Sequence, residues 1–293
     1  MTSINDFLDN ILSDFKDYLY SGQKLCKLHD AHFDAGKVPD YSDINIQQLY
    51  LLRYAYAYAF EYKYMYGSLL HNFPAGKEID VTSVGCGSMI DYWSLAKAVD
   101  ENCIINYRGI DTIEWYYNFP SHPADSVGYY CENAVDFFQN EDLSSDIYIF
   151  PKSISEFSLN EINQISSCFS RESILKDRIS FMFSLRTDQG SMQRDMQKTE
   201  TIFNRLVECG FQTTSKRNGY YQFDDSIRGK TIRSVDSDFS HPGDVIDCLK
   251  ELYCYCPSYK DCIKQVMCKN RLGRFPILKC SYAAWQTFTF ERM

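Results

Sequence analysis

A short glycine turn between an apolar run and a helical segment constrains this chain more than any other feature. Residues 79–90 read Ile-Asp-Val-Thr-Ser-Val-Gly-Cys-Gly-Ser-Met-Ile, and residues 107–111 read Tyr-Arg-Gly-Ile-Asp. The first run predicts a strand that breaks at the glycines into a helix, and the second predicts another strand that ends on a carboxylate. A turn where backbone approaches a ligand, beside an acid at the tip of the next strand, is typical of nucleotide-type cofactor sites.

Beyond residue 78 the chain alternates apolar runs with amphipathic segments. A repeating strand–helix order leads to a mostly parallel sheet covered on both faces, so we expect an α/β fold. Strands are predicted at 79–84, 105–110, 127–131, 145–150, 178–185, 220–223 and 281–290, and helices at 4–20, 91–100, 133–139, 158–169 and 194–209.

An aromatic block precedes the glycine turn at residues 47–70. Tyrosine or phenylalanine recurs at every second position from 54 to 66, a spacing that favours a strand. The block contains no turn signal and is too long for a strand, so we expect a helix. Two roles stay open: a helix packed on the domain through its tyrosines, or a lid over the cofactor with Arg53, Tyr58 and Glu61 as polar contacts.

The turn itself favours S-adenosylmethionine over a dinucleotide. Gly85 and Gly87 have no Cβ, so the backbone can approach a ligand closely and adopt positive φ. The third glycine of the dinucleotide fingerprint is missing, which argues against a pyrophosphate-containing cofactor. Asp111 can accept two hydrogen bonds from ribose hydroxyls, and its alternative role is a helix or turn cap.

With these features the chain resembles the class I S-adenosylmethionine-dependent methyltransferases. The resemblance is carried by residues 83–88 (Ser-Val-Gly-Cys-Gly-Ser), 109–111 (Gly-Ile-Asp) and the predicted fourth strand with its loop, 146–157. It implies a Rossmann-like sheet, mostly parallel with an antiparallel last strand, and a set of cofactor-binding residues at the strand ends. The residues so implied are Ser83, Gly85, Cys86, Gly87, Asp111, Thr112, Glu132, Asn133 and Pro151, with Cys131 also beside the adenine.

Two positions depart from the family pattern. An acidic residue usually stands two before the first glycine, where this chain has Ser83, so the usual carboxylate near the cofactor's amino group is missing. The family places the methyl acceptor beside residues 150–153, where an Asn/Asp-Pro-Pro-aromatic motif holds amines. This chain has Phe-Pro-Lys-Ser there, so an exocyclic amine acceptor is not supported. Lys152 is the candidate catalytic residue, which either orients an anionic substrate or is only solvated.

Six of the twelve cysteines lie between residues 248 and 280. Thiolates clustered in a chain without an export signal suit tetrahedral zinc or a 4Fe–4S cluster. Free cysteines in an insertion are the alternative. The predicted metal ligands are Cys254, Cys256, Cys262 and Cys268.

Charge is spread unevenly along the chain. The net charge is −9, yet residues 214–293 hold 13 basic and 9 acidic side chains, and residues 262–280 include five lysines or arginines and no acid. This stretch is either a solvated basic surface or a contact for the phosphates of RNA or DNA.

The sequence also allows predictions of location and of domain organisation. It has no apolar run long enough to span a bilayer and no N-terminal leader, so we expect no membrane partner and a cytoplasmic location. Its predicted organisation is an N-terminal helical cap (1–77), a cofactor-binding domain (78–223 plus 277–293) and a cysteine-rich insertion (224–276).

The leading functional prediction is methyl transfer from S-adenosylmethionine, with nucleic acid, and RNA first, as the acceptor. One alternative is a binding or assembly protein that keeps the fold with reduced catalysis, and another is an enzyme that uses the same cofactor without methyl transfer. The tyrosine-rich helix and the cysteine cluster are also similar in layout to the ribosomal small-subunit methyltransferase-like family, which includes mitochondrial ribosome assembly factors.

Overall fold

The computed structural model describes residues 3–31, 39–71, 78–187, 189–224, 243–276 and 282–292. These residues divide into two units, whose border falls inside one long helix, α3 (Ile44–Leu70). We name them the helical unit and the sheet unit. The helical unit comprises Met1–Phe60, Glu114–Pro120 and Arg233–Cys280, and the sheet unit comprises Glu61–Ile113, Ser121–Ile232 and Ser281–Met293.

The division groups the amino-terminal helices with the cysteine-rich segment, which the sequence treats as separate parts. The predicted domain borders after residues 77 and 223 and before residue 277 adjoin stretches outside the described residues. They stay predictions.

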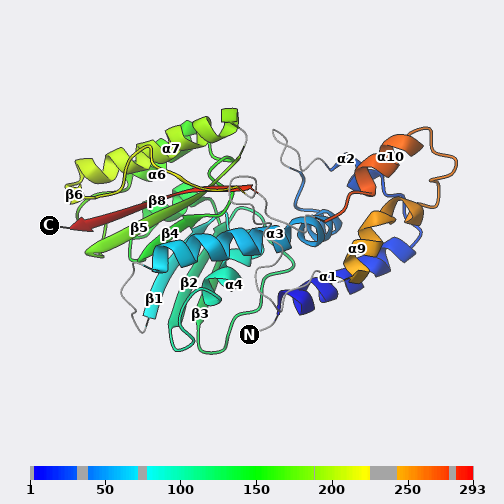
Figure 1. Cartoon of the computed structure of the whole chain (residues 1–293), viewed down its shortest axis with the longest axis horizontal. Helices are drawn as coiled ribbons and strands as arrows, with labels where there is room; N and C mark the ends of the chain where they lie inside the picture. Colours follow the sequence, from blue (N-terminus) through cyan, green and yellow to red (C-terminus); the bar gives the residue numbers. More distant parts are fainter. Residues whose placement is uncertain are drawn as a thin grey trace. The chain divides into compact units, whose positions relative to one another are not determined.

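One mixed sheet forms the centre of the sheet unit (Figure 1). Its strands are β1 (Glu78–Val84), β2 (Ile104–Asp111), β3 (Ser126–Cys131), β4 (Ile147–Phe150), β5 (Arg178–Leu185), β6 (Phe211–Gln212), β7 (Tyr221–Asp224) and β8 (Tyr282–Arg292). The order is β3-β2-β1-β4-β5-β8-β6, and β7 pairs with β8 off that path. Strands β1 to β5 are parallel, whereas β8 is antiparallel to β5, β6 and β7. The predicted α/β sheet with an antiparallel last strand is confirmed.

Helices cover both faces of this sheet (Figure 1). They are α4 (Ile90–Ala96), α5 (Ala134–Asn140), α6 (Leu159–Ser167) and α7 (Gln189–Glu208). In Figure 1, α6 and α7 lie over one face, and α4 and the second half of α3 lie over the other. The strand order reverses between β1 and β4, since β2 and β3 follow on one side and β5 on the other. Ligands of open α/β sheets bind at the carboxyl ends of the strands at such a reversal.

Aromatic side chains fill the core between β5, β8 and α7. Phe183, Phe288 and Phe290 are fully buried. The ring of Phe203 from α7 lies 5.0 Å from that of Phe288 and 5.4 Å from that of Phe290. Rings at these separations bury much apolar surface and add an edge-to-face attraction, so they fix α7 onto the sheet.

The aromatic block is part of α3, as predicted, and its buried positions explain why a two-residue spacing suits a helix. In the sheet unit, Tyr62, Met65, Tyr66 and Leu69 are buried. Their separations of three and four residues follow one helical stripe. The intervening tyrosines turn to other sides, and Tyr64 meets the ring of Trp285 at 5.6 Å.

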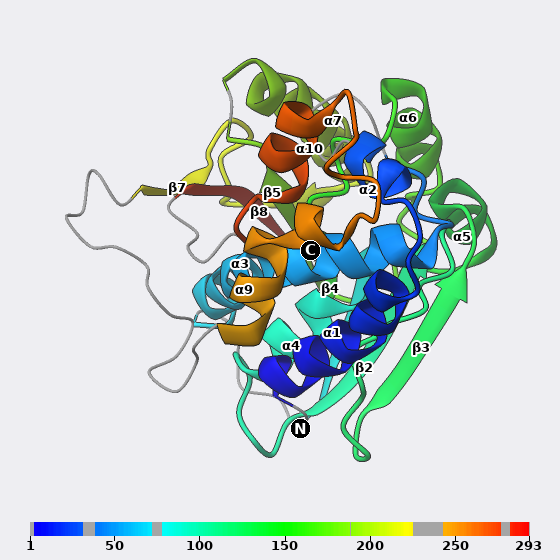
Figure 2. The same cartoon turned by 90° about the vertical axis from the view of Figure 1, so that its right-hand side faces the viewer.

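The helical unit contains α1 (Ile4–Tyr20), α2 (Cys26–Asp30), the first part of α3, α9 (Gly243–Lys250), the 3-10 helix η1 (Leu252–Tyr255) and α10 (Gln265–Leu272). Within this unit α1 contacts α9, and α2 contacts α10 (Figure 2). The guanidinium of Arg53 donates to the carbonyls of Arg271 and Leu272 at 3.0 and 3.2 Å. Arg53 therefore holds the end of α10, which differs from the predicted polar contact of a lid.

No helix of the described residues combines the length and apolar character needed to cross a bilayer.

Helix α6 begins with a capping box that permits a stability test. The Ser158 hydroxyl accepts from the Glu161 N–H, and the Glu161 carboxylate accepts from the Ser158 N–H at 2.7 Å. Ser158→Ala is expected to lower the free energy of unfolding by about 1 kcal/mol, because an orphan amide loses its acceptor. Urea denaturation measures the change. Ser158→Thr keeps the acceptor and serves as the control; equal losses in both variants would contradict the cap's role.

Candidate functional site

The glycine turn follows β1 at the carboxyl edge of the sheet, where the strand order reverses. Gly85 and Gly87 have φ of 70° and 54°, in the left-handed region that glycine enters without strain. The N–H groups of Gly85 and Cys86 donate to the Ile110 carbonyl at 2.7 and 3.0 Å, which anchors the turn to β2. Both glycines are partly exposed, so their backbone is accessible to a ligand.

Asp111 ends β2 beside this turn. Its carboxylate accepts from the N–H of Gly87 at 2.8 Å and from the N–H of Ile113 at 2.9 Å. Asp111 therefore organises the turn and presents negative charge at its rim, in the place that the sequence predicts for ribose.

Gly85 also packs closely against the loop that follows β4. A Cβ built on Gly85 would lie 2.4 Å from the Cβ of Ser153. Ser153 in turn donates to the Val84 carbonyl. The loop after β4 and the glycine turn therefore form one packed unit, and no side chain fits at residue 85.

Gly85→Ala is expected to lower the free energy of unfolding by about 2 kcal/mol. The left-handed backbone alone costs a non-glycine residue roughly 1–2 kcal/mol, and the overlap with Ser153 adds to it. Thermal denaturation measures the loss, and Ser153→Gly in the same chain should restore part of it. Gly190→Ala is the matched control, since a Cβ at this helical glycine meets nothing within 4 Å. A Gly85 variant as stable as the Gly190 variant would contradict the prediction.

Lys152, the predicted catalytic residue, is already held by the protein. Its ammonium lies 2.7 Å from the Glu61 carboxylate and donates to the Leu185 carbonyl at 3.1 Å. Glu61 is 97% buried and also accepts from the hydroxyl of Ser184. A paired ammonium offers little net charge to an anionic substrate, so the geometry favours a structural clamp between α3 and the ends of β4 and β5.

Two residues at the edge have left-handed backbone without being glycine. Met89 has φ of 59° and Lys152 has φ of 61°, and they are the non-glycine residues with positive φ in the described part of the chain. Such backbone costs energy and persists where the surroundings hold it, which is often at functional sites. The sequence gives no sign of either, because neither residue type favours this conformation.

Glu156 is a second carboxylate, which the sequence does not single out. It ends a tight turn in which its N–H donates to the Ser153 carbonyl at 2.8 Å. Its side chain reaches solvent, yet desolvation of the carboxyl group and the nearby Asp111 raise its pKa to about 7, opposed by Arg186. Glu156 is therefore a carboxylate near the turn that can exchange a proton near neutral pH.

The residues predicted beside the adenine gather at the ends of β2 and β3. Asp111 pairs with Cys131 in the sheet register, and the Glu132 N–H donates to the Asp111 carbonyl at 2.9 Å. Asn133 caps α5 by accepting from the Val135 N–H. Thr112 is exposed next to Asp111. The structure brings these residues together, and their roles stay predictions.

Ser83, Cys86 and Pro151 differ from the other predicted cofactor residues because all three side chains are buried. Ser83 has no exposed surface. A ligand at the turn therefore meets the backbone of Gly85 and Gly87 rather than the Ser83 hydroxyl.

The predicted metal site is not supported, and the prediction is corrected. No group of three or more cysteine, histidine or acidic side chains in the described residues is placed to hold a metal ion. Burial and the neighbouring Cys262 raise the pKa of the Cys268 thiol, whereas the pKa of the Cys256 thiol is lowered, because its burial is outweighed by hydrogen bonds with Leu25 and Ser258. Cys280 lies outside the described residues.

The basic stretch 262–280 contributes partly to the fold. Arg271 donates to the His29 carbonyl at 3.4 Å. Lys264, Lys269 and Arg274 are exposed, and Lys279 lies outside the described residues. Exposed cations alone are typical of many surfaces, so an RNA or DNA contact here is unsupported and stays a prediction.

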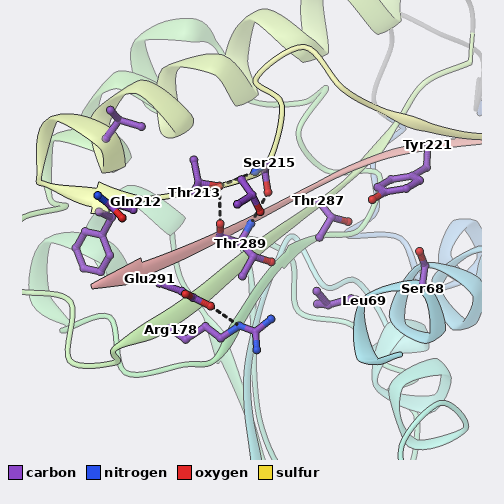
Figure 3. A pocket seen from close by; sticks show the side chains of 13 residues that line it. Ser68, Leu69, Arg178, Gln212, Thr213, Ser215, Tyr221, Thr287, Thr289 and Glu291 are labelled. Carbon is purple, nitrogen blue, oxygen red and sulfur yellow. Dashed lines mark hydrogen bonds and ion pairs between the residues drawn. The ribbon is translucent and has the colours of Figure 1, made fainter. Parts of the chain in front are cut away.

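A separate cavity of about 760 Å³ lies towards the amino end of β5, away from the glycine turn (Figure 3). Arg178 and Glu291 line it and form an ion pair at 3.7 Å. Its other polar lining is mostly hydroxyl groups, including Thr213, Ser215 and Thr289. The Thr289 N–H donates to Ser215 and the Thr289 carbonyl accepts from Thr213. Thr213 and Ser215 thus form hydrogen bonds with the backbone of β8. Neither Met89 nor Lys152, the described non-glycine residues with positive φ, lines this cavity.

No protein-family model and no curated protein matches this chain. Solved structures match it at low identity. One is a cyclopropane-fatty-acyl-phospholipid synthase-like protein from Lactobacillus casei, with a TM-score of 0.40, 11% identity and coverage of 79% of this chain and 90% of that one. Another is a SAM-dependent methyltransferase from Geobacter sulfurreducens in complex with S-adenosyl-L-homocysteine, with a TM-score of 0.39, 12% identity and coverage of 80% of this chain and 91% of that one. A third is a putative sarcosine dimethylglycine methyltransferase from Galdieria sulphuraria, with a TM-score of 0.37, 11% identity and coverage of 95% of this chain and 97% of that one.

The sheet is Rossmann-like. At these scores the fold class rests on the strand order and its reversal between β1 and β4. The narrower resemblance to the ribosomal small-subunit methyltransferase-like family is not supported by the comparisons.

Proposed function

We propose that this chain binds S-adenosylmethionine at the glycine turn and Asp111 and transfers its methyl group to an acceptor beside the loop after β4. The observation that carries the proposal is the left-handed backbone at Gly85, Gly87, Met89 and Lys152. These residues lie at the ends of β1 and β4, where the fold places its ligands. Backbone held in this region is often found at functional sites.

The donor set fits the cofactor. Accessible backbone at Gly85 and Gly87 suits the methionine part, and the Asp111 carboxylate suits a ribose diol, because a charged acceptor strengthens both bonds. Thr112, Glu132 and Asn133 would then border the adenine. When bound, the cofactor supplies an electrophilic methyl group on sulfur.

The protein's own contribution is alignment and proton removal. Methyl transfer is an in-line displacement, so the packed turn and loop would fix the geometry of the two reacting groups. Glu156 would accept the proton that a hydroxyl or amine acceptor loses, since its raised pKa suits a base that works near neutral pH. The Lys152–Glu61 pair would hold the loop that carries Glu156.

Transfer of labelled methyl from S-adenosylmethionine tests the proposal. The purified chain is incubated with a cell extract that is then separated into small-molecule, protein, RNA and DNA fractions. Label in one fraction supports the enzyme and identifies its acceptor class, including the RNA that the sequence first predicts. Calorimetry with S-adenosylhomocysteine is run alongside.

The outcomes separate the competing functions. Binding without label in any fraction would favour the binding or assembly protein. Binding with consumption of the cofactor but no transferred methyl would favour another use of the cofactor. If S-adenosylhomocysteine did not bind at all, the proposed cofactor site would be wrong.

A further inference from the structure

A carboxylate that forms no ion pair within the described residues lies buried behind the glycine turn. Asp91, in the first turn of α4, has no exposed surface. It accepts from the hydroxyls of Tyr107 at 2.9 Å and Tyr66 at 3.5 Å. None of the ion pairs among the described residues includes Asp91. The described part of the chain therefore gives this group hydroxyl donors but no opposite charge.

Among the titratable groups around the buried Asp91 carboxylate, Asp91 itself is the one whose pKa lies near neutral pH. Tyr66 faces it from α3, Tyr107 from β2 and Cys86 from the turn, and burial raises the pKa of all three well above their ordinary values. Burial also raises the pKa of Asp91 to about 6, although its hydrogen bonds act in the opposite direction. Removing a charge from water without a partner is costly, and perturbed carboxylates of this kind are common at functional sites.

We propose that the Asp91 carboxylate attracts the α-ammonium group of the cofactor's methionine part to the glycine turn, as a positioning residue that the ligand does not touch. The proposal rests on the proposed function. Ser83 leaves the end of β1 without a carboxylate, and Asp91 supplies one from the first turn of α4, the helix that follows the glycine turn. Cys86, at the centre of the turn, lies within electrostatic range of both Asp91 and Asp111, so a cation at the turn meets two negative charges.

A purely structural role for Asp91 makes a different prediction. The Asp91 hydrogen bonds join α3, α4 and β2, so a structural loss would weaken every adenosine ligand alike. An electrostatic role acts only on ligands that carry the ammonium group and only when Asp91 is ionised. Affinity for such ligands should then be lost as pH falls through about 6.

Calorimetry with two ligands between about pH 5 and about pH 8 tests this. S-adenosylhomocysteine contains the amino-acid part, and 5′-methylthioadenosine lacks it. The unaltered chain should bind the first about tenfold more tightly at the high end of the range and the second equally throughout. Asp91→Asn should bind S-adenosylhomocysteine about tenfold more weakly at pH 8, without pH dependence, and 5′-methylthioadenosine as before.

Two further variants distinguish Asp91 from the other groups that could cause the pH dependence. Glu156 also titrates near the turn, so Glu156→Gln should retain the pH dependence if Asp91 causes it. Tyr107→Phe removes a donor to the ionised form, so the midpoint for S-adenosylhomocysteine should move to higher pH. This variant decides the matter if Asp91→Asn does not fold.

Three results would overturn the proposal. One is Asp91→Asn with unchanged affinity and pH profile, and another is an equal loss for both ligands. The third is an unshifted midpoint in Tyr107→Phe. If the unaltered chain bound neither ligand, the cofactor site itself would be wrong; binding of 5′-methylthioadenosine with a flat S-adenosylhomocysteine profile would leave that site standing and refute only the role of Asp91.

Discussion

Asp111→Ala is expected to lower the affinity for S-adenosylhomocysteine by at least about a hundredfold. The carboxylate accepts the Gly87 and Ile113 amides, so its removal releases the turn as well as the contact with ribose. A hydrogen bond to a charged group contributes about 1.5–3 kcal/mol, and two such bonds to a ribose diol account for this loss. Calorimetry at one pH above 7 measures it.

The control for Asp111 is Asp142→Ala, which removes the same charge from an exposed position on a loop. Its affinity should match that of the unaltered chain. Thermal denaturation of both variants shows whether the folded state survives. Folded Asp111→Ala protein that binds as tightly as the control would remove Asp111 from the site, and 5′-methylthioadenosine should lose as much affinity as S-adenosylhomocysteine because both contain the ribose.

Glu156→Gln is expected to reduce methyl transfer by about a hundredfold or more while affinity for S-adenosylhomocysteine changes less than threefold. General bases contribute roughly 10²–10⁴ in rate, and glutamine keeps the shape without accepting the proton. In the unaltered chain the rate should fall as pH drops below about 7, because the base becomes protonated. The labelled-methyl assay, with the fraction that takes up label, measures both effects.

Glu172→Gln is the matched control for Glu156, since Glu172 is an exposed carboxylate on another loop. Its rate and pH profile should equal those of the unaltered chain. A Glu156 variant that keeps both the rate and the pH dependence would exclude Glu156 as the base. A variant that loses cofactor affinity in proportion to rate would instead indicate a binding role.

Much of the sheet could be predicted because its strands are apolar runs bounded by turn residues. The run at 79–84 corresponds to β1 (Glu78–Val84), and the run at 178–185 corresponds to β5. The ends of helices were harder to predict than the strands. Helix α7 begins at Gln189, five residues before the predicted start at residue 194. The aromatic helix was decided by length, since periodicity alone favoured a strand.

The candidate site could be predicted only where glycine or a strand-end acid marks it. Gly85, Gly87 and Asp111 carry such marks, and the structure places them together. The left-handed backbone of Met89 and Lys152 has no sequence signal, because the packing around the turn imposes it. The pKa of Glu156 depends first on desolvation of its carboxyl group and then on its approach to Asp111, and neither can be read from residues 45 positions apart in the sequence.

The cysteines are a case in which the sequence predicted a site that the structure does not support. Four thiols within fifteen residues suggested a metal on spacing alone. Spacing along the chain does not determine where side chains point, and within the described residues no group of three or more cysteine, histidine or acidic side chains is placed to hold a metal ion.

The hydroxyls that line the cavity near β8 also affect how open the edge of this strand is to pairing with another chain. Between β6 and β7 the edge of β8 has no strand partner among the described residues, and an uncovered edge is a template for pairing with another chain. Ser215 and Thr213 occupy the amide and carbonyl of Thr289, and the Gln286 side chain engages the same loop at Gly219. Side chains thereby occupy the edge in place of a strand, so replacing Ser215 and Thr213 with alanine would open a site for intermolecular β-pairing and aggregation.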